Sequence, residues 1–409
     1  MIRKVFIVGT FSFPSGQAAS ARMAQLALGF SDHVDSVKVL SIFGQSETRP
    51  KSWARYEHRE DISYYYITEY DFQGSSPWLR IKNRFLQFLG RNAILDELGR
   101  NLSGKEDELV FAYGRSYHFM KGLQKRKSRA GWKTKLVFDI VEPPHSQENF
   151  LSYLKHPFAL DSKWVFSKKL IGSFDGCTFI TESLLKRFHE ISKSSLIVPS
   201  MLYPSQEGLQ PVQEELAPVE SKKEIHIGYL GSLIKKDNPQ LLLDLGDHLN
   251  RLGFPIRIHI VGRFELFEEG RMWKSRFQKS AISESVVFYS DPTDSERDKL
   301  LATFDFLVMF RFPDQLQKDT FPTRVVELLK ANKPLIINSF GDLNLYFEHG
   351  KNCIDIDPNK LPSIEDWNTI TQNQVLKKIQ KGGAKLLSTK FSSKVQAKSI
   401  IDWMSDERE

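Results

Sequence analysis

The chain has 409 residues, of which 41% are apolar and 26% charged, and its formal net charge is +7. This length exceeds that of one ordinary hydrophobic core, so two domains are expected. The two cysteines exclude a disulfide framework, and no apolar run approaches the ~18 residues that span a bilayer. We therefore predict a cytoplasmic protein in a reducing compartment, placed at the inner face of the membrane if it contacts one.

The positive charge is concentrated in the first half of the chain. Residues 1–200 contain 29 Lys and Arg against 20 Asp and Glu, a net charge of +9, and the remainder carries −2. This asymmetry indicates an anionic partner for the first half or, alternatively, a solvated basic face. The candidate partners are a membrane surface, nucleic acid and a phosphorylated substrate.

The first half alternates strands with helices, which is typical of α/β units. Strands are predicted at Val5–Val8, Ser36–Ile42, Ile62–Ile67, Glu108–Tyr113, Leu136–Ile140, Phe174–Ile180 and Leu196–Val198. Helices are predicted up to about Phe30, at Met120–Arg129 and at Leu184–Ile191. A further basic amphipathic helix, Trp78–Leu89, either lies in a membrane interface or packs on a sheet.

Ligands of open α/β sheets bind outside the carboxyl ends of the strands. This rule gathers one set of residues at a single rim, where we predict an acceptor-binding site: Gly16, Arg22, Arg115, Glu142 and His145. The small residues around Gly16 allow a substrate to approach the backbone, or simply allow a helix to pack on the sheet. His145 is a candidate base or hydroxyl-binding group, with an ordinary loop histidine as the alternative.

The second half repeats the α/β pattern after a polar linker at 206–224. Strands are predicted at Ile225–Leu230, Ile256–Val261, Val286–Tyr289, Phe304–Phe310, Leu335–Ile337 and Cys353–Ile356, and helices at Asn238–Leu249 and Ser295–Thr303. Continuous apolar strands indicate a parallel sheet buried on both faces. We predict an α/β fold of two Rossmann-like doubly wound domains, 1–205 and 225–390, facing a central cleft, with a helix in 391–409 that packs back on the first domain.

Two loops of the second half suit a phosphate. Gly231 permits close backbone approach, and Lys235 and Lys236 can neutralise phosphate oxygens, unless they are simply solvated. Arg263 follows the next strand. Further on, Pro322 suits a first helical position, which leaves the amides of Thr323 and Arg324 at a positive helix end.

Two carboxylates flank that helix start. Glu327 is placed to accept hydrogen bonds from ribose hydroxyls, and Asp319 is placed to reach the sugar or its phosphate. The alternatives are a solvated helix glutamate and a loop carboxylate or helix cap.

This second half resembles the nucleotide-binding domain of family 4 glycosyltransferases, which have the GT-B fold. The family has a glutamate, seven residues and a second glutamate, which appear here as Asp319 and Glu327, followed by Lys333-Pro334. The resemblance is good over 225–360. Asp319 replaces the first glutamate, Ser232 stands where the family usually has a phosphate-binding arginine, and Asp237-Asn238 interrupts the usual Lys-Gly.

The resemblance implies a retaining transfer of a sugar from a nucleotide-diphosphate sugar, with UDP or GDP as the nucleotide and without a metal or other cofactor. The acceptor would be a glycan or a lipid-linked glycan of cell-surface polysaccharide or lipopolysaccharide synthesis, with a hexosyl group as the sugar moved. The implied catalytic residues are Asp319, Glu327, His145 and Lys236. The implied donor-binding residues are Gly231, Ser232, Lys235, Arg263, Phe321, Pro322, Thr323 and Arg324.

Two other functions stay open. One is a sugar-nucleotide epimerase of the same fold, and the other is a non-catalytic protein that binds glycan or membrane through the basic domain. Nucleic acid is not expected as a partner, because aromatic residues are not regularly interleaved in the basic segment Lys121–Lys135.

Overall fold

The computed structural model describes residues 1–14, 18–44, 53–57, 59–69, 90–114, 116–142, 164–204 and 224–406. The chain divides into two compact units. Unit 1 comprises Met1–Tyr203, Asp319–Phe321 and Phe391–Glu409, and unit 2 comprises Pro204–Lys318 and Pro322–Lys390. The predicted site residues Gly16, Arg115 and His145, the predicted helix Trp78–Leu89 and most of the linker lie outside the described residues.

Unit 1 is built on an eight-stranded sheet in the order β3-β4-β2-β1-β5-β6-β7-β8. Its strands are β1 (Lys4–Ser12), β2 (Ser36–Gly44), β3 (Ala54–Tyr56), β4 (Arg59–Glu69), β5 (Glu108–Tyr113), β6 (Lys135–Ile140), β7 (Gly176–Phe179) and β8 (Ser195–Ile197). Only the edge pair β3–β4 is antiparallel among these described strands. Strand β3 was not predicted from the sequence, because three residues are too few to show a period-two pattern.

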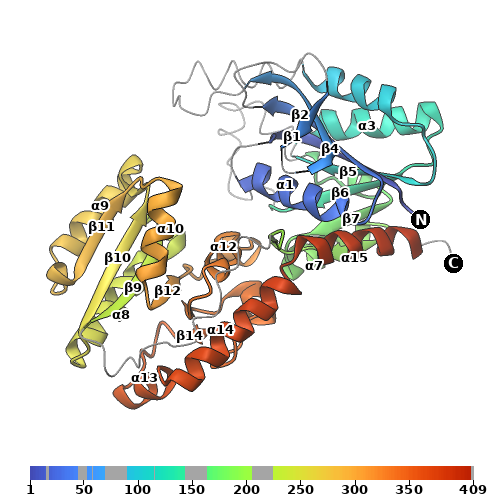
Figure 1. Cartoon of the computed structure of the whole chain (residues 1–409). Helices are drawn as coiled ribbons and strands as arrows, with labels where there is room; N and C mark the ends of the chain where they lie inside the picture. The colour runs from blue at the N-terminus through green and yellow to red at the C-terminus, as the bar shows by residue number, and fades with distance from the viewer. Residues whose placement is uncertain are drawn as a thin grey trace. The chain divides into compact units, whose positions relative to one another are not determined.

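The helices of unit 1 are α1 (Ala18–Ser31), a helical stretch at 90–101, α3 (Tyr117–Ala130), α6 (Lys168–Ile171), α7 (Glu182–Phe188) and α15 (Ser393–Asp406). The C-terminal helix α15 packs on α1, as Figure 1 shows. A Cβ atom on Gly29 of α1 would lie 2.3 Å from the carbonyl oxygen of Ser393. Only glycine therefore allows the two helices to approach this closely.

Unit 2 is built on a six-stranded parallel sheet in the order β11-β10-β9-β12-β13-β14 (Figure 1). Its strands are β9 (Ile225–Leu230), β10 (Ile256–Gly262), β11 (Val286–Ser290), β12 (Phe306–Met309), β13 (Leu335–Ile337) and β14 (Ile354–Asp355). Chain order runs outward from β9 in one direction to β11 and from β12 in the other direction to β14. The order therefore reverses between β9 and β12, and such a switch point is where open α/β sheets bind ligands.

The helices of unit 2 are α8 (Pro239–Arg251), α9 (Glu268–Gln278), α10 (Asp294–Thr303), α11 (Gln315–Lys318), α12 (Arg324–Lys330), α13 (Ile364–Ile370) and α14 (Asn373–Ser388). The helices α9, α11, α13 and α14 were not predicted from the sequence. In α14 the pair Gly382-Gly383 weakens the intrinsic preference for helix. The helix forms there because it packs closely: a Cβ on Gly382 would lie 2.2 Å from the carbonyl oxygen of Lys351.

The apolar core of unit 2 explains why its strands could be recognised. Leu241, Leu245 and Leu249 of α8 share one helical face and join the same buried cluster as Ile256 and Ile258 of β10. Because helices cover the sheet, its strands are apolar on both sides and appear in the sequence as continuous apolar runs. No described helix is both long enough and apolar enough to cross a membrane.

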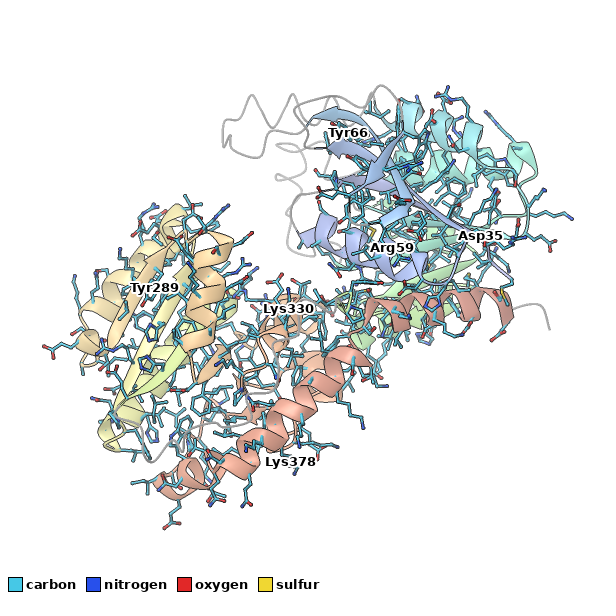
Figure 2. All side chains as sticks on the ribbon, in the orientation of Figure 1. Asp35, Arg59, Tyr66, Tyr289, Lys330 and Lys378 are labelled. Carbon is cyan, nitrogen blue, oxygen red and sulfur yellow. The ribbon has the colours of Figure 1, made fainter. Side chains whose placement is uncertain are left out.

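Two histidines interrupt this apolar surface. The Nδ1 atom of His226 lies 2.9 Å from Nε2 of His259, and Nδ1 of His259 lies 3.3 Å from the hydroxyl of Tyr289 on β11 (Figure 2). Burial, and then the nearby His226 and Arg257, lower the pKa of His259 to about 4, against the opposing influence of Glu224 and Asp305. His259 is therefore neutral in the folded protein at pH 7.

We expect acid to destabilise the protein through His259. The pKa of His259 is 6.5 in the unfolded chain and about 4 in the folded chain. Between these two pH values the unfolded chain binds a proton at His259 and the folded chain does not. The neutral His259 therefore makes its full contribution to the free energy of unfolding above pH 6.5. This contribution falls by about 3 kcal/mol as the pH drops from 6.5 to 4. Denaturant unfolding at pH 7.5, 6 and 5 measures the effect, which His259→Gln should flatten. The exposed His189 is the control, and a His189→Gln variant that flattened the profile equally would contradict the assignment.

Candidate functional site

The candidate site lies at the switch point of unit 2. Gly231 directly follows β9, and Arg311 follows β12 after the single intervening residue Phe310. The two strands are parallel neighbours, with Val308 opposite Tyr229, so their carboxyl ends lie at the same edge of the sheet. Residues far apart in the sequence are therefore brought together where this fold class binds ligands.

Gly231 is closely packed. A Cβ atom on this residue would lie 2.4 Å from Nη1 of Arg324 and 2.5 Å from the hydroxyl oxygen of Tyr229. Real Cβ atoms do not approach other atoms this closely, so a glycine is required for the guanidinium of Arg324 to lie against the backbone. The sequence predicted both residues for the donor site, and the structure brings them together.

A buried carboxylate lies between two arginines beside this glycine. Oδ1 of Asp237 is 3.5 Å from Nη1 of Arg311, and Oδ2 of Asp237 is 3.4 Å from Nη1 of Arg324. The hydroxyl of Tyr229 donates a hydrogen bond to Oδ2 of Asp237 at 3.1 Å and accepts one from the amide of Leu233 at 3.2 Å. We call Tyr229, Asp237, Arg311 and Arg324 the arginine cluster.

The charges of the arginine cluster act on one another. Burial lowers the pKa of Arg311, and the like charge of Arg324 lowers it further, while Asp237 opposes both. Burial also tends to lower the pKa of Arg324, but Asp237 and Tyr229 outweigh it and the net shift is upward. Burial raises the pKa of Tyr229, so its hydroxyl stays protonated as a donor. Both arginines are charged, and the cluster carries more positive than negative charge.

Arg311 was not predicted from the sequence as a site residue, and Asp237 appeared there only as a departure from the family pattern. A signal for Arg311 does exist, because it is the first charged residue after the apolar run Phe306–Phe310. Its position next to Gly231, however, depends on the strand order β9–β12, which the sequence does not reveal.

The other residues predicted at the donor loops are more exposed. Lys235 and Lys236 are exposed in the 3-10 turn η3 (Lys235–Asp237), and Nζ of Lys235 lies 4.8 Å from the ring centre of Phe312. Arg263 donates to Oδ1 of Asp291 at 2.7 Å in an exposed ion pair. Ser232 is half-buried. Solvent weakens the interactions of exposed charges, so these cations are less effective than buried ones.

Glu327 lies in the first turn of α12, the seven-residue helix that ends at Lys330 (Figure 2). Its side chain is exposed and has no hydrogen-bond or ion-pair partner among the described residues. Surrounding protein atoms raise the pKa of Glu327, and Arg324 and Arg297 partly offset that rise. Thr323 is exposed and Pro322 is buried at the start of this helix. The amide of Val325 donates to the carbonyl of Pro322, which begins the first turn.

Asp319, the other predicted carboxylate, belongs to unit 1. Its Oδ1 accepts a hydrogen bond from the hydroxyl of Ser183 at 2.6 Å, and its Oδ2 forms an ion pair with Arg187 at 2.9 Å. The hydroxyl of Thr181 donates to its backbone carbonyl at 3.3 Å. The next predicted donor residue, Phe321, is buried and its ring packs on Phe391. Both oxygens of the Asp319 carboxylate therefore have partners within unit 1.

Arg22 has a structural role, which differs from the acceptor-binding role that the sequence predicts. Its Nε and Nη2 donate to the two carboxylate oxygens of Asp139 at 2.8 and 2.9 Å, and Nη1 donates to the carbonyl of Pro199 at 2.9 Å. Nη2 also donates to the carbonyl of Val198 at 3.0 Å. The side chains of Arg22 and Asp139 are 5% and 0% exposed, so these donors do not face a ligand. Glu142, predicted at the same rim, is exposed.

Within the described part of the chain, no group of three or more His, Cys, Asp or Glu side chains is placed to hold a metal ion.

The whole chain is similar in structure to glycosyltransferases of the GT-B fold. Trehalose-6-phosphate synthase OtsA matches over 98% of this chain and 99% of its own length, with a TM-score of 0.64 and 10% identity. HepE from Anabaena in complex with UDP and glucose matches over 98% and 99%, with a TM-score of 0.61 and 13% identity. WaaG, a glycosyltransferase involved in lipopolysaccharide biosynthesis, matches over 98% and 100%, with a TM-score of 0.61 and 12% identity.

Comparison of the sequence with protein-family models and with curated proteins gives no match. The structural matches confirm the predicted fold class: the chain is an α/β protein with the GT-B fold, built from two parallel-sheet units.

We expect Arg22→Met to destabilise the protein strongly, because it leaves the buried Asp139 carboxylate without its cation. The free energy of unfolding should fall by about 3–5 kcal/mol. Arg3→Met is the matched control, since Arg3 forms an exposed ion pair with Asp35 whose removal should cost at most about 1 kcal/mol. Denaturant unfolding measures both, and an equal loss for the two variants would contradict a structural role of Arg22.

We expect Gly231→Ala to displace the Arg324 guanidinium, because the new methyl group would occupy its position. Overpacking of this kind costs about 1–3 kcal/mol of stability. Nucleotide affinity, measured by calorimetry with UDP and GDP, should fall with it. Gly99→Ala is the control, since a Cβ there would meet only one side-chain atom, at 3.9 Å. Unchanged nucleotide binding by Gly231→Ala would show that Arg324 does not need this position.

Proposed function

We propose that the protein is a glycosyltransferase that moves a sugar from a nucleotide-diphosphate sugar to a glycan or lipid-linked acceptor. The observation that supports this best is the half-exposed guanidinium of Arg324, held against Gly231 at the switch point of unit 2. A fixed cation at the switch point of an open α/β sheet suits a diphosphate. The similarity of fold to HepE, which was solved with UDP and glucose, agrees with a nucleotide ligand.

The chemistry asks mainly for stabilisation of the leaving group. The bond between the anomeric carbon and the diphosphate oxygen breaks, and the diphosphate takes both electrons. An acceptor hydroxyl forms the new bond to the anomeric carbon and gives its proton to the departing diphosphate oxygen. Arg324 stabilises the negative charge that develops on the diphosphate, with the amide of Thr323 and the ammonium of Lys236 as further donors. Preorganised positive charge of this kind is often the largest single contribution to catalysis.

We assign Glu327 to the ribose. Its exposed carboxylate lies on α12, one turn from Arg324, and no described residue uses it as a hydrogen-bond acceptor. Two neighbouring ribose hydroxyls can donate to one carboxylate.

In this proposal the sugar is transferred with retention, so the acceptor hydroxyl approaches on the face that the diphosphate leaves. Glu142 and His145 remain the proposed acceptor-side residues.

We propose that unit 1 meets the acceptor at or near an anionic membrane surface. Its helix α3 carries Lys121, Lys125, Arg126, Lys127 and Arg129. The side chain of Trp164 is exposed, and its ring lies 6.2 Å from that of Tyr117 at the start of α3. Exposed tryptophan beside basic residues suits the interface of an anionic bilayer. This placement fits a cytoplasmic protein in cell-surface polysaccharide or lipopolysaccharide synthesis.

The decisive experiment screens UDP, GDP and their hexose conjugates for binding and for sugar transfer. We expect one nucleotide diphosphate to bind, and its sugar to be transferred or slowly hydrolysed. Glu327→Ala should weaken nucleotide affinity by about tenfold, the effect of losing hydrogen bonds to a charged group. Calorimetry and product analysis give the two readings.

Four outcomes test the site and separate the candidate functions. Full activity of Glu327→Ala would remove Glu327 from the site. Conversion of the sugar nucleotide to an isomer without any acceptor would identify an epimerase. Nucleotide binding without transfer or hydrolysis would favour a non-catalytic protein, which the use of Asp319 by Ser183 and Arg187 also favours. Binding of neither UDP nor GDP would contradict the proposed function itself.

A further inference from the structure

The two arginines beside Asp237 differ in how far they reach the surface. The side chain of Arg324 is 28% exposed, whereas those of Arg311 and Asp237 are 10% and 4% exposed. The three groups carry two positive charges and one negative charge, an excess of one positive charge. Asp314 also attracts Arg311, but less than Asp237 does. Of the two arginines, Arg324 is therefore the one that a ligand from solvent can reach.

Arg311 is fixed from several sides. Its amide donates to Oδ1 of Asn338 at 2.7 Å, and its carbonyl accepts from Nδ2 of the same residue at 2.9 Å. Its Nη2 donates to the side-chain oxygen of Gln317. This residue is therefore held in place before any ligand arrives, and its guanidinium points to Asp237.

We propose that Arg311 neutralises Asp237, so that Arg324 keeps its charge available for the donor diphosphate. The proposal rests on the function proposed above. Asp237 and Arg311 are positioning residues, and Arg324 is the group that touches the ligand. Without Arg311, the Asp237 carboxylate at 3.4 Å would cancel most of the charge of Arg324. Ser232, on the loop after β9, stands where related sequences usually have a phosphate-binding arginine. In this chain the pair Arg311 and Arg324 at the switch point would take over that positive charge.

The arrangement also explains why the loop can carry Asp237 at all. A carboxylate beside a diphosphate would repel it, and the repulsion is strong where solvent is excluded. Here the hydroxyl of Tyr229 and the guanidinium of Arg311 occupy the carboxylate and turn it into an anchor for Arg324. The exposed Lys235 and Lys236 contribute less, because solvent screens them.

The test is a charge rescue measured by calorimetry with UDP, GDP and the neutral nucleosides uridine and guanosine. Arg311→Gln removes the excess charge, and nucleoside diphosphate affinity should fall by roughly ten- to hundredfold. Adding Asp237→Asn to Arg311→Gln restores a net charge of one positive charge in the cluster. The affinity for nucleoside diphosphates should then recover by at least about tenfold. Nucleoside affinity should change little in either variant. Arg311→Lys keeps the charge but loses the fork that contacts both Gln317 and Asp237, so its affinity should lie between those of the wild type and Arg311→Gln.

The controls separate charge from folding. Lys330→Gln removes an exposed cation from the same helix α12 and should leave affinity unchanged (Figure 2). Thermal melting monitors the fold of every variant. If Arg311→Gln does not fold, Asp237→Asn alone carries the test: its excess charge rises to two, so the salt dependence of diphosphate binding should become steeper and affinity should not fall.

The outcomes that overturn the inference are distinct from failure of the proposed function. If the wild type binds neither UDP nor GDP, both are wrong. If the wild type binds and Arg311→Gln binds equally well, the inference alone is wrong. It is also wrong if Asp237→Asn fails to rescue a folded Arg311→Gln, since a purely structural Arg311 would give that result. Loss of affinity on replacing Lys235 and Lys236, with none on replacing Arg311, would place the phosphate charge on the loop instead.

Discussion

The contact on which the candidate site depends is that of the Asp237 carboxylate with the guanidiniums of Arg311 and Arg324. These residues come from three separate parts of unit 2: the turn after β9, the end of β12 and the start of α12. Removing Asp237 would leave the buried guanidinium of Arg311 without this carboxylate, and removing both arginines would leave Asp237 buried without a cation of the cluster. The cluster therefore fixes the relative positions of the segments that surround the switch point.

Close packing of glycines extends this constraint to the neighbouring loops. A Cβ on Gly262, at the end of β10, would lie 2.5 Å from the carbonyl oxygen of Gly231, and a Cβ on Gly270 would lie 2.8 Å from that of Ser232. Gly262 also has a φ of 145°, which disfavours other residues. The loops after β9 and β10 are consequently pressed against each other and against α9. The guanidinium of Arg324 can lie against the backbone of Gly231 because neighbouring segments hold that backbone in place.

The sequence predicts the sheets well and the site only in part, for one physical reason. Strands such as β9 and β13 are buried on both faces, so their apolar runs show in any sequence. Gly231, Arg324 and Glu327 belong to short patterns in which residue type and spacing carry the meaning. Arg311 does not, because its role depends on which strands are neighbours. Arg22 was predicted at the ligand-binding rim because ligands bind at the carboxyl ends of strands. Its guanidinium instead donates hydrogen bonds to Asp139, 117 residues later in the sequence.

The pair Asp319 and Glu327 shows how spacing can mislead. Eight positions separate the two carboxylates, and a pattern of this kind suggests one shared ligand. The chain, however, leaves unit 2 after Lys318, belongs to unit 1 from Asp319 to Phe321, and returns to unit 2 at Pro322. Asp319 is 3% exposed and bound by Ser183 and Arg187, whereas Glu327 is exposed and has no such partner among the described residues. Through these contacts Asp319 anchors the segment Asp319–Phe321 in unit 1. Of the two carboxylates, that of Glu327 is the one that remains available to a ligand.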